Sequence, residues 1–173
     1  QKALVNNLNI LESAEEKYRE LEAKAAEDKA KAENVINLIN AIGEVTLDSK
    51  DAIEKARAEY EELTADQKAL VNNLGTLESA EERYNKLAGD RAAADEVIRK
   101  INAIGEVTLE SKDVIEEAEA AYNALTAEQK ELVSNYDVLE AARIAFDKLA
   151  ADKAAVDNVI ALIDAIGVPD INS

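Results

Sequence analysis

Apolar side chains recur at intervals of three and four residues along most of the chain, which is the spacing of an amphipathic helix. Segment 53–63 shows this most clearly, with apolar residues on one helix face at Ile53, Ala56, Tyr60 and Leu63. The stretch 10–42 contains no glycine or proline. It predicts one helix of about 33 residues, roughly 50 Å long. The hydrophobic pattern therefore predicts an all-α protein.

Glycine and threonine mark where these helices end and begin. Gly43, Gly105 and Gly167 each follow an apolar helical stretch, at the C′ position that glycine favours. Thr46 and Thr108 follow the first two glycines and predict helix N-caps. In each case the acidic residue two positions later is the alternative cap.

Two further threonines begin capping boxes, in which a threonine bonds forward and a glutamine three residues later bonds back. Thr64 to Gln67 and Thr126 to Gln129 have this pattern, and the first predicts a short helix that continues through Asn72. A cap-type residue followed three residues later by glutamate is expected to begin each long helix. This signal occurs at Asn9 and Glu12, Gly75 and Glu78, and Asp137 and Glu140.

The chain is a tandem repeat. Residues 1–18 and 67–84 align without gaps and differ at three positions, and a looser copy of the same block begins at Gln129. The sequence Ala-Ile-Gly-Glu-Val-Thr-Leu occurs at 41–47 and again at 103–109. The blocks are 66 and 62 residues apart, a period that suits small helical bundles stacked along one axis.

A helix as long as 10–42 is buried along its length only if two bundles share it. The sequence therefore predicts tandem three-helix bundles joined in line by long shared helices, like a spectrin rod. The expected parts are residues 1–31 as the C-terminal helix of an upstream module with its linker helix, 32–88 as a three-helix module, 89–93 as a linker within a shared helix, 94–150 as a second module, and 151–173 as the first helix of a truncated or terminal downstream module. Leu11, Tyr18 and Leu21 then lack partners, unless the two ends pair or chains associate.

The repeat also predicts the core. Positions that are apolar in both copies are expected inside: Val35, Ile36, Ile39 and Ile42 with Val97, Ile98, Ile101 and Ile104. Leu38 matches Lys100 and is therefore expected outside. The third face is expected to come from Leu70, Val71, Leu74, Leu77 and Tyr84.

The amino-acid composition argues against most kinds of catalytic and metal-binding site. The 173 residues carry a net charge of −17 and include no histidine, cysteine, methionine or tryptophan. The sequence thus lacks a thiol nucleophile, a histidine base and the usual soft metal ligands. The negative charge argues against nucleic acid and anionic lipid as partners. No apolar run reaches the length of a membrane span, so no membrane insertion is expected.

Carboxylates and serines are the remaining candidates for chemistry. Adjacent acids occur at 15–16, 61–62 and 116–117, but 37 acidic residues make such pairs common on solvated helix faces. Segment 48–51 lacks the glycine of a calcium loop. Ser49 and Ser111 stand beside lysines, but a thin bundle offers no cleft for a Ser–Lys nucleophile. We expect no enzyme activity, no catalytic residue, no cofactor and no metal.

The aromatic residues share repeat positions with other apolar residues. Phe146 matches Tyr18 and Tyr84, while Tyr136 stands where the other copies have leucine. Residues that exchange with phenylalanine or leucine are typical of a core or its edge rather than of a ligand platform.

The turn and cap segments resemble those of a known group of repeats. Ile-Gly-Glu-Val-Thr-Leu-(Asp/Glu)-Ser-Lys-Asp and Leu-Thr-Ala-(Asp/Glu)-Gln-Lys resemble the tandem three-helix repeats of large Gram-positive surface proteins, of the kind grouped as FIVAR-like. The resemblance covers nearly the whole chain and implies a spacer on a bacterial cell surface, outside the cell. Because the chain opens on Gln1, we expect a fragment without its targeting and anchor segments.

Two functions from different classes remain. The first is a rod-like spacer that projects flanking domains of the same polypeptide, and we expect such a chain to be a monomer. The second is a helical module that binds a host protein such as immunoglobulin or albumin. Variation between the copies on one helix favours the spacer, because Lys55, Arg57 and Glu59 become Glu117, Glu119 and Ala121. If each module used the same face to bind a partner, the residues of that face would be expected to be alike in both copies.

Overall fold

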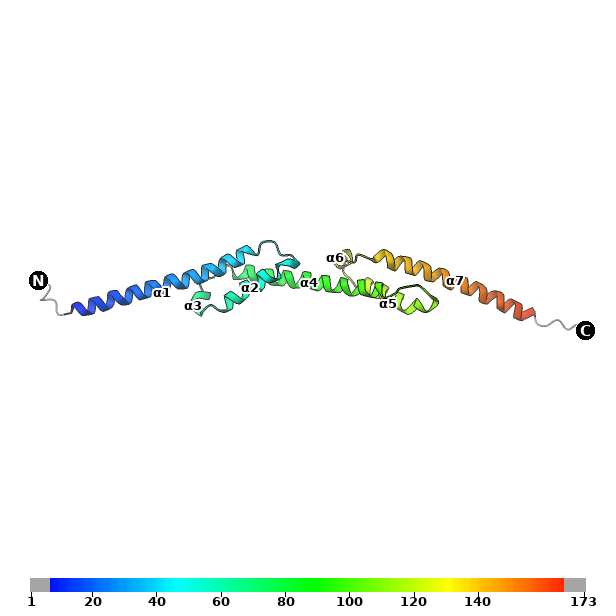
Figure 1. Cartoon of the computed structure of the whole chain (residues 1–173), viewed down its shortest axis with the longest axis horizontal. Helices are drawn as coiled ribbons and strands as arrows, with labels where there is room; N and C mark the ends of the chain where they lie inside the picture. Colours follow the sequence, from blue (N-terminus) through cyan, green and yellow to red (C-terminus); the bar gives the residue numbers. More distant parts are fainter. Residues whose placement is uncertain (1–6, 167–173) are drawn as a thin grey trace, which may run out of the picture. The chain divides into compact units, whose positions relative to one another are not determined.

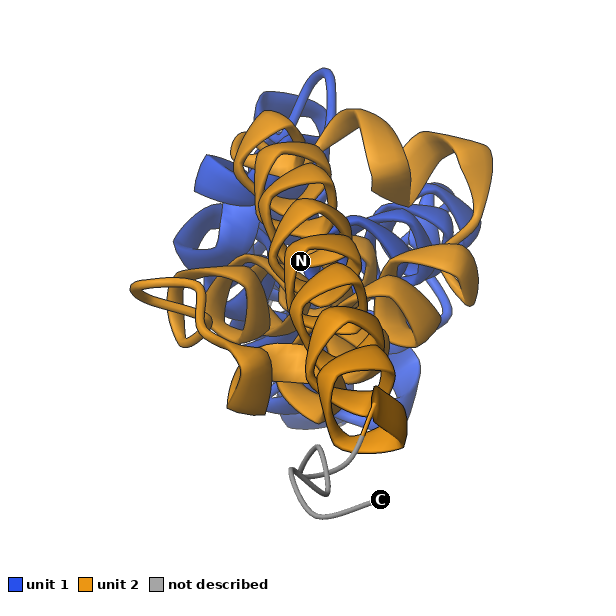
Figure 2. Ribbon diagram, turned by 90° about the vertical axis from the view of Figure 1, so that its right-hand side faces the viewer, with its two compact units in different colours: residues 1–88 blue, residues 89–173 orange. Residues whose placement is uncertain are grey.

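Helices and the turns between them make up all of the regular structure in residues 7–166, the part of the chain that the computed structural model describes (Figure 1). No strand occurs among these residues, so the predicted all-α class is confirmed. The α-helices are α1 (Leu8–Ala41), α2 (Lys50–Glu61), α3 (Ala65–Lys68), α4 (Leu74–Asn102), α5 (Lys112–Asn123), α6 (Ala127–Glu131) and α7 (Tyr136–Ile166). The chain divides into two compact units, residues 1–88 and 89–173 (Figure 2).

Unit 1 has a core built from the second half of α1, from α2 and from the first half of α4. Its fully buried large side chains include Val35, Ile39 and Leu77. The remaining buried residues of this core are Ala32, Val45, Ile53, Ala56, Leu63, Val71 and Ala80. Three helices therefore enclose one small apolar core, as amphipathic patterning requires.

Unit 2 repeats this core 62 residues later. Val97, Ile101 and Leu139 occupy the positions of Val35, Ile39 and Leu77. The other buried residues are Ala94, Ile104, Ile115, Ala118, Val133, Ala142 and Phe146. Eight of the ten buried positions are equivalent in the two copies, which is why the repeat predicted most of the core.

The long helices are unbroken. α1 covers 34 residues, as the stretch 10–42 predicts, and α4 covers 29. α4 supplies Leu77 and Ala80 to the core of unit 1 and Ala94 and Val97 to the core of unit 2. One helix therefore serves two cores, and Gly89 lies inside it without ending it.

Local sequence signals explain the turns. Gly43 and Gly105 have φ of 62° and 61°, the left-handed conformation that glycine adopts without strain. Thr46 and Thr108 cap the short 3₁₀-helices Leu47–Ser49 and Leu109–Ser111, which lead directly into α2 and α5. Both threonine caps are therefore confirmed. Gly167, the third predicted C′ glycine, lies outside the described residues.

Some predicted boundaries were wrong. α3 ends at Lys68 instead of continuing through Asn72. Each long helix begins at the residue directly before the expected cap, and α4, for example, starts at Leu74 and not after Gly75. Asn73, the residue before α4, turns its side chain to α1, where its Nδ2 donates to the Ile36 carbonyl oxygen at 3.1 Å. Asn73 thus ties the start of α4 to α1 through a contact that a local cap pattern does not reveal.

Two core predictions also need correction. Leu70 is 47% exposed, because α3 has ended before it and helical spacing no longer applies there. Leu38, expected outside, is partly buried against the core of unit 1. Its counterpart Lys100 pairs with Glu117 of α5, so in unit 2 this position faces the second helix. An aliphatic residue and a long cation both suit the edge of a core.

Within the described residues, no helix combines the length and the apolar character that crossing a bilayer requires.

Candidate functional site

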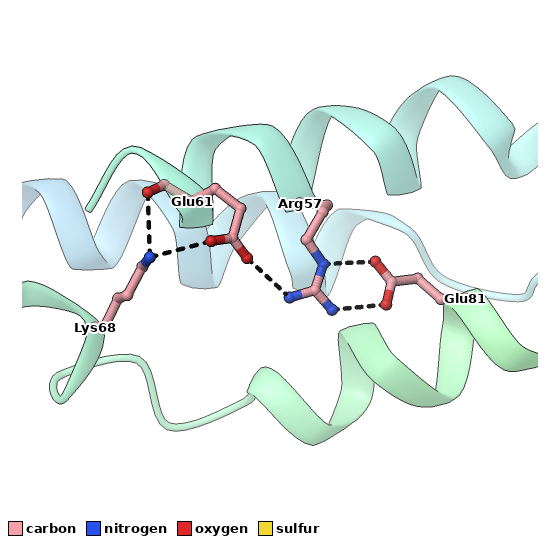
Figure 3. Close-up of polar contacts among 4 residues, drawn as sticks. All are labelled: Arg57, Glu61, Lys68 and Glu81. Carbon is pink, nitrogen blue, oxygen red and sulfur yellow. Dashed lines mark hydrogen bonds and ion pairs between the residues drawn. The ribbon is translucent and has the colours of Figure 1, made fainter. Parts of the chain in front are cut away.

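In unit 1 an ion pair with two hydrogen bonds joins α2 to α4 (Figure 3). Arg57 donates from Nε and Nη2 to the two carboxylate oxygens of Glu81, at 2.7 and 2.6 Å. Both side chains are only about one-third exposed, at 30% and 28%. The hydrogen bonds to Glu81 raise the pKa of Arg57 above its ordinary value. A two-pronged charge-assisted pair of this kind fixes the register of the two helices.

Glu61 and Lys68 extend this contact. Glu61 lies 3.6 Å from Arg57 Nη1, and Lys68 Nζ donates to both the carboxylate and the backbone oxygen of Glu61 (Figure 3). Lys68 also lies 5.1 Å from the ring centre of Tyr60. Since Lys68 is the last residue of α3, these contacts hold the short helix against the end of α2.

Unit 2 has the same pair with its charges reversed. Glu119 of α5 stands at the position of Arg57, and Arg143 of α7 stands at the position of Glu81. Arg143 donates from Nε and Nη2 to the two carboxylate oxygens of Glu119, the first at 2.7 Å. These hydrogen bonds hold the pKa of Glu119 below its ordinary value and raise that of Arg143.

The reversal corrects one sequence argument. The change from Arg57 to Glu119 is not the loss of an outer face; it is half of a compensated exchange between two helices. Sequence reasoning missed this pair. The signal that could have found it is that two positions 24 residues apart reverse charge together between the copies.

A second set of polar contacts ties each short helix to the first helix of its unit. Gln67 donates from Nε2 to Asp28 at 2.7 Å, and Gln129 donates in the same way to Asp90 at 2.8 Å. Both glutamines also close the predicted capping boxes. One side chain therefore caps its own helix and anchors that helix to a neighbour.

Both serines and several of the acids considered for chemistry have structural partners. Ser49 and Ser111 accept hydrogen bonds from the backbone N–H groups of Thr46 and Thr108, so both hydroxyls complete capping boxes. Glu61 serves the ion-pair network described above, and Glu117 pairs with Lys100. Across residues 7–166, no three acidic side chains converge as metal ligands would.

Unit 2 has a groove that combines aromatic and charged side chains. Tyr122 and Tyr136 stack with their ring centres 4.1 Å apart, and Lys130 Nζ lies 5.2 Å from the Tyr122 ring. The groove is also lined by Arg143 and by Ile144, whose side chain is 70% exposed. Unit 1 has Leu74 and Glu82 where unit 2 has Tyr136 and Ile144. This groove is the clearest chemical difference between the two units.

No family model, curated protein or solved structure matches the chain.

Proposed function

We propose that the chain is a non-enzymatic, rod-like spacer that projects flanking domains of the same polypeptide from a bacterial cell surface. One observation carries the proposal: α4 runs without a break from Leu74 to Asn102 and supplies residues to both cores. A continuous helix supports a spacer better than a glycine- and serine-rich linker, which behaves as a flexible coil.

The repeat sets the length that each module adds. In unit 1, Asn73 lies directly before α4 and beside the Ile36 carbonyl oxygen, and Ile98 of α4 is the unit 2 counterpart of Ile36. Ile98 follows Asn73 by 25 residues. At 1.5 Å per residue, each further module is expected to lengthen the rod by about 38 Å.

Small-angle X-ray scattering tests this spacing. Inserting a second copy of residues 89–150 after Ala150 is expected to lengthen the maximum dimension by about 38 Å. The matched control interrupts α4 at 88–91 with a glycine–serine linker, and there the dimension is expected to become broadly distributed. A maximum dimension that does not grow with the added module excludes a rod-like spacer.

A second candidate, a helical binding module for a host protein such as immunoglobulin or albumin, is favoured by the groove of unit 2. Its Tyr136 and Ile144 are absent from unit 1, so one specialised copy can bind while the other does not. Immobilised chain is incubated with serum proteins, and the variant Tyr136→Leu with Ile144→Glu serves as control. Saturable, salt-resistant capture that this variant loses supports binding.

A further inference from the structure

Two helix faces near the ends of the described chain are apolar and exposed. On the first half of α1, Leu11 and Tyr18 are 54% and 62% exposed, and on the last part of α7, Val159 and Ile163 are 52% and 60% exposed. Single exposed apolar residues are ordinary, but a continuous row along one helix face indicates an interaction surface. We name Leu8, Leu11, Ala14, Tyr18 and Leu21 the α1 face, and Val156, Val159, Ile160, Ile163 and Ile166 the α7 face.

The α1 face is a second copy of a surface that is packed in unit 1. Each of its residues recurs unchanged 66 positions later in α4, at Leu74, Leu77, Ala80, Tyr84 and Leu87. There, Leu77 is fully buried and Ala80 nearly so, against the second half of α1. The α1 face therefore carries the apolar side chains of the third helix of a unit. In the described part of the chain, no first helix packs against them.

The α7 face copies the opposite surface. Its residues lie 124 positions after Ala32, Val35, Ile36, Ile39 and Ile42, which form the first helix of unit 1. Val35 and Ile39 are each only 1% exposed, because α2 and α4 cover them. The α7 face therefore carries the apolar side chains of the first helix of a unit. In the described part of the chain, no third helix packs against them.

The packing inside each of the two units shows which helix covers such a face. In unit 1 the first half of α4 packs on the second half of α1, and in unit 2 the first half of α7 packs on the second half of α4. We propose that the α1 face of one copy of this chain packs on the α7 face of a second copy, with the two helices parallel. This goes beyond the spacer function, because it joins one chain to the next.

Polar contacts support the same register. Asn73 donates to the Ile36 carbonyl oxygen and to Asn40 Oδ1, and Asn135 makes the equivalent contacts in unit 2. Asn7 stands 66 residues before Asn73. Between copies, Asn7 meets the Ile160 carbonyl and Asp164, the α7 counterparts of Ile36 and Asn40.

The contact is heterologous, since it joins two different surfaces, and it leaves one face free at each end of a dimer. Association therefore continues to longer chains as protein concentration rises. The contact is also weak, because it contains two of the three helices of a unit and the side that α2 or α5 covers stays open. The net charge of −17 opposes it, so it strengthens with ionic strength.

Sedimentation equilibrium up to millimolar protein, in about 0.15 M salt, tests the proposal. The wild-type mean mass is expected to rise with concentration without a plateau at the dimer. Leu11→Asp and Ile163→Asp are each expected to remain monomeric. Both side chains are exposed, so both variants should keep the helical circular dichroism of the wild type; Tyr18→Asp and Val159→Asp replace any variant that does not. Ile144→Asp adds the same charge at an exposed site away from both faces and should associate like wild type.

A mixture of the two variants separates this contact from a symmetric one. Leu11→Asp keeps its α7 face and Ile163→Asp keeps its α1 face, so an equimolar mixture is expected to form dimers and nothing larger. A wild-type chain that stays monomeric at all concentrations overturns the proposal. So does continued association of Leu11→Asp or Ile163→Asp alone, because it means that like faces pair.

Discussion

At the scale of single residues, the two units keep a contact and exchange its charges. Arg57 pairs with Glu81, and Glu119 pairs with Arg143, each through two parallel hydrogen bonds. What the repeat preserves is the opposition of charge between two helices, and either helix can carry the cation. A residue that differs between the copies is therefore not necessarily free to vary.

Charge reversal should be tolerated only when both partners change. Arg57→Glu places a second carboxylate beside Glu81 and is expected to lower the free energy of unfolding by about 1 kcal/mol, since the pair is partly exposed. Adding Glu81→Arg recreates the polarity of unit 2 and should restore most of that loss. Urea unfolding followed by circular dichroism measures both. No recovery in the double variant means that the pair contributes no coupling.

Glu119 makes the stability of unit 2 depend on pH in the acid range. Its folded pKa lies below the ordinary value because Arg143 donates to the carboxylate. Its stabilising contribution is thus complete above about pH 4.3 and is lost as the pH falls through the lowered folded pKa. Glu119→Gln should reduce stability at pH 7 and flatten the acid decline below about pH 4.3. The exposed Glu131→Gln is the control; an equal flattening there contradicts the assignment.

At the scale of elements, signals that act within a few residues were predictable from the sequence. The caps at Thr46 and Thr64 and the C′ turn at Gly43 depend on neighbouring backbone groups alone. The contacts of Asn73 and Arg57 were not predictable in the same way. They join residues 37 and 24 positions apart, so they depend on the register of packed helices.

Two glycines should respond in opposite directions to the same substitution. Gly89 lies inside α4 with nothing within 4 Å of an added Cβ, so Gly89→Ala is expected to stabilise the chain by about 0.5–1 kcal/mol. Gly43 has φ of +62°, where Gly43→Ala should cost about 1 kcal/mol although the space is open. Thermal unfolding of both variants tests this, with Gly105→Ala as a second left-handed site. Destabilisation by Gly89→Ala would indicate that α4 bends there.

At the scale of the whole molecule, carboxylates outnumber cations by 37 to 20. Their mutual repulsion opposes the folded state at neutral pH, and added salt screens it. The melting temperature is therefore expected to rise as sodium chloride increases from low to physiological concentration at pH 7. Sodium sulfate at equal ionic strength separates screening from specific anion effects. A melting temperature that falls steadily with sodium chloride contradicts the dominance of repulsion over the surface ion pairs.

The reversed ion pairs also bear on how a nearly repetitive chain avoids folding with the wrong helix. If α2 were exchanged with α5, Arg57 would face Arg143 and Glu119 would face Glu81. Both exchanged pairs bring like charges together, so their repulsion disfavours the packing of a helix from one module into the other during folding. Giving unit 2 the polarity of unit 1, with Glu119→Arg and Arg143→Glu, removes this discrimination while keeping each native pair. Such a variant should refold with a larger misassembled fraction. The charges of each module therefore disfavour packing with a helix of the neighbouring module.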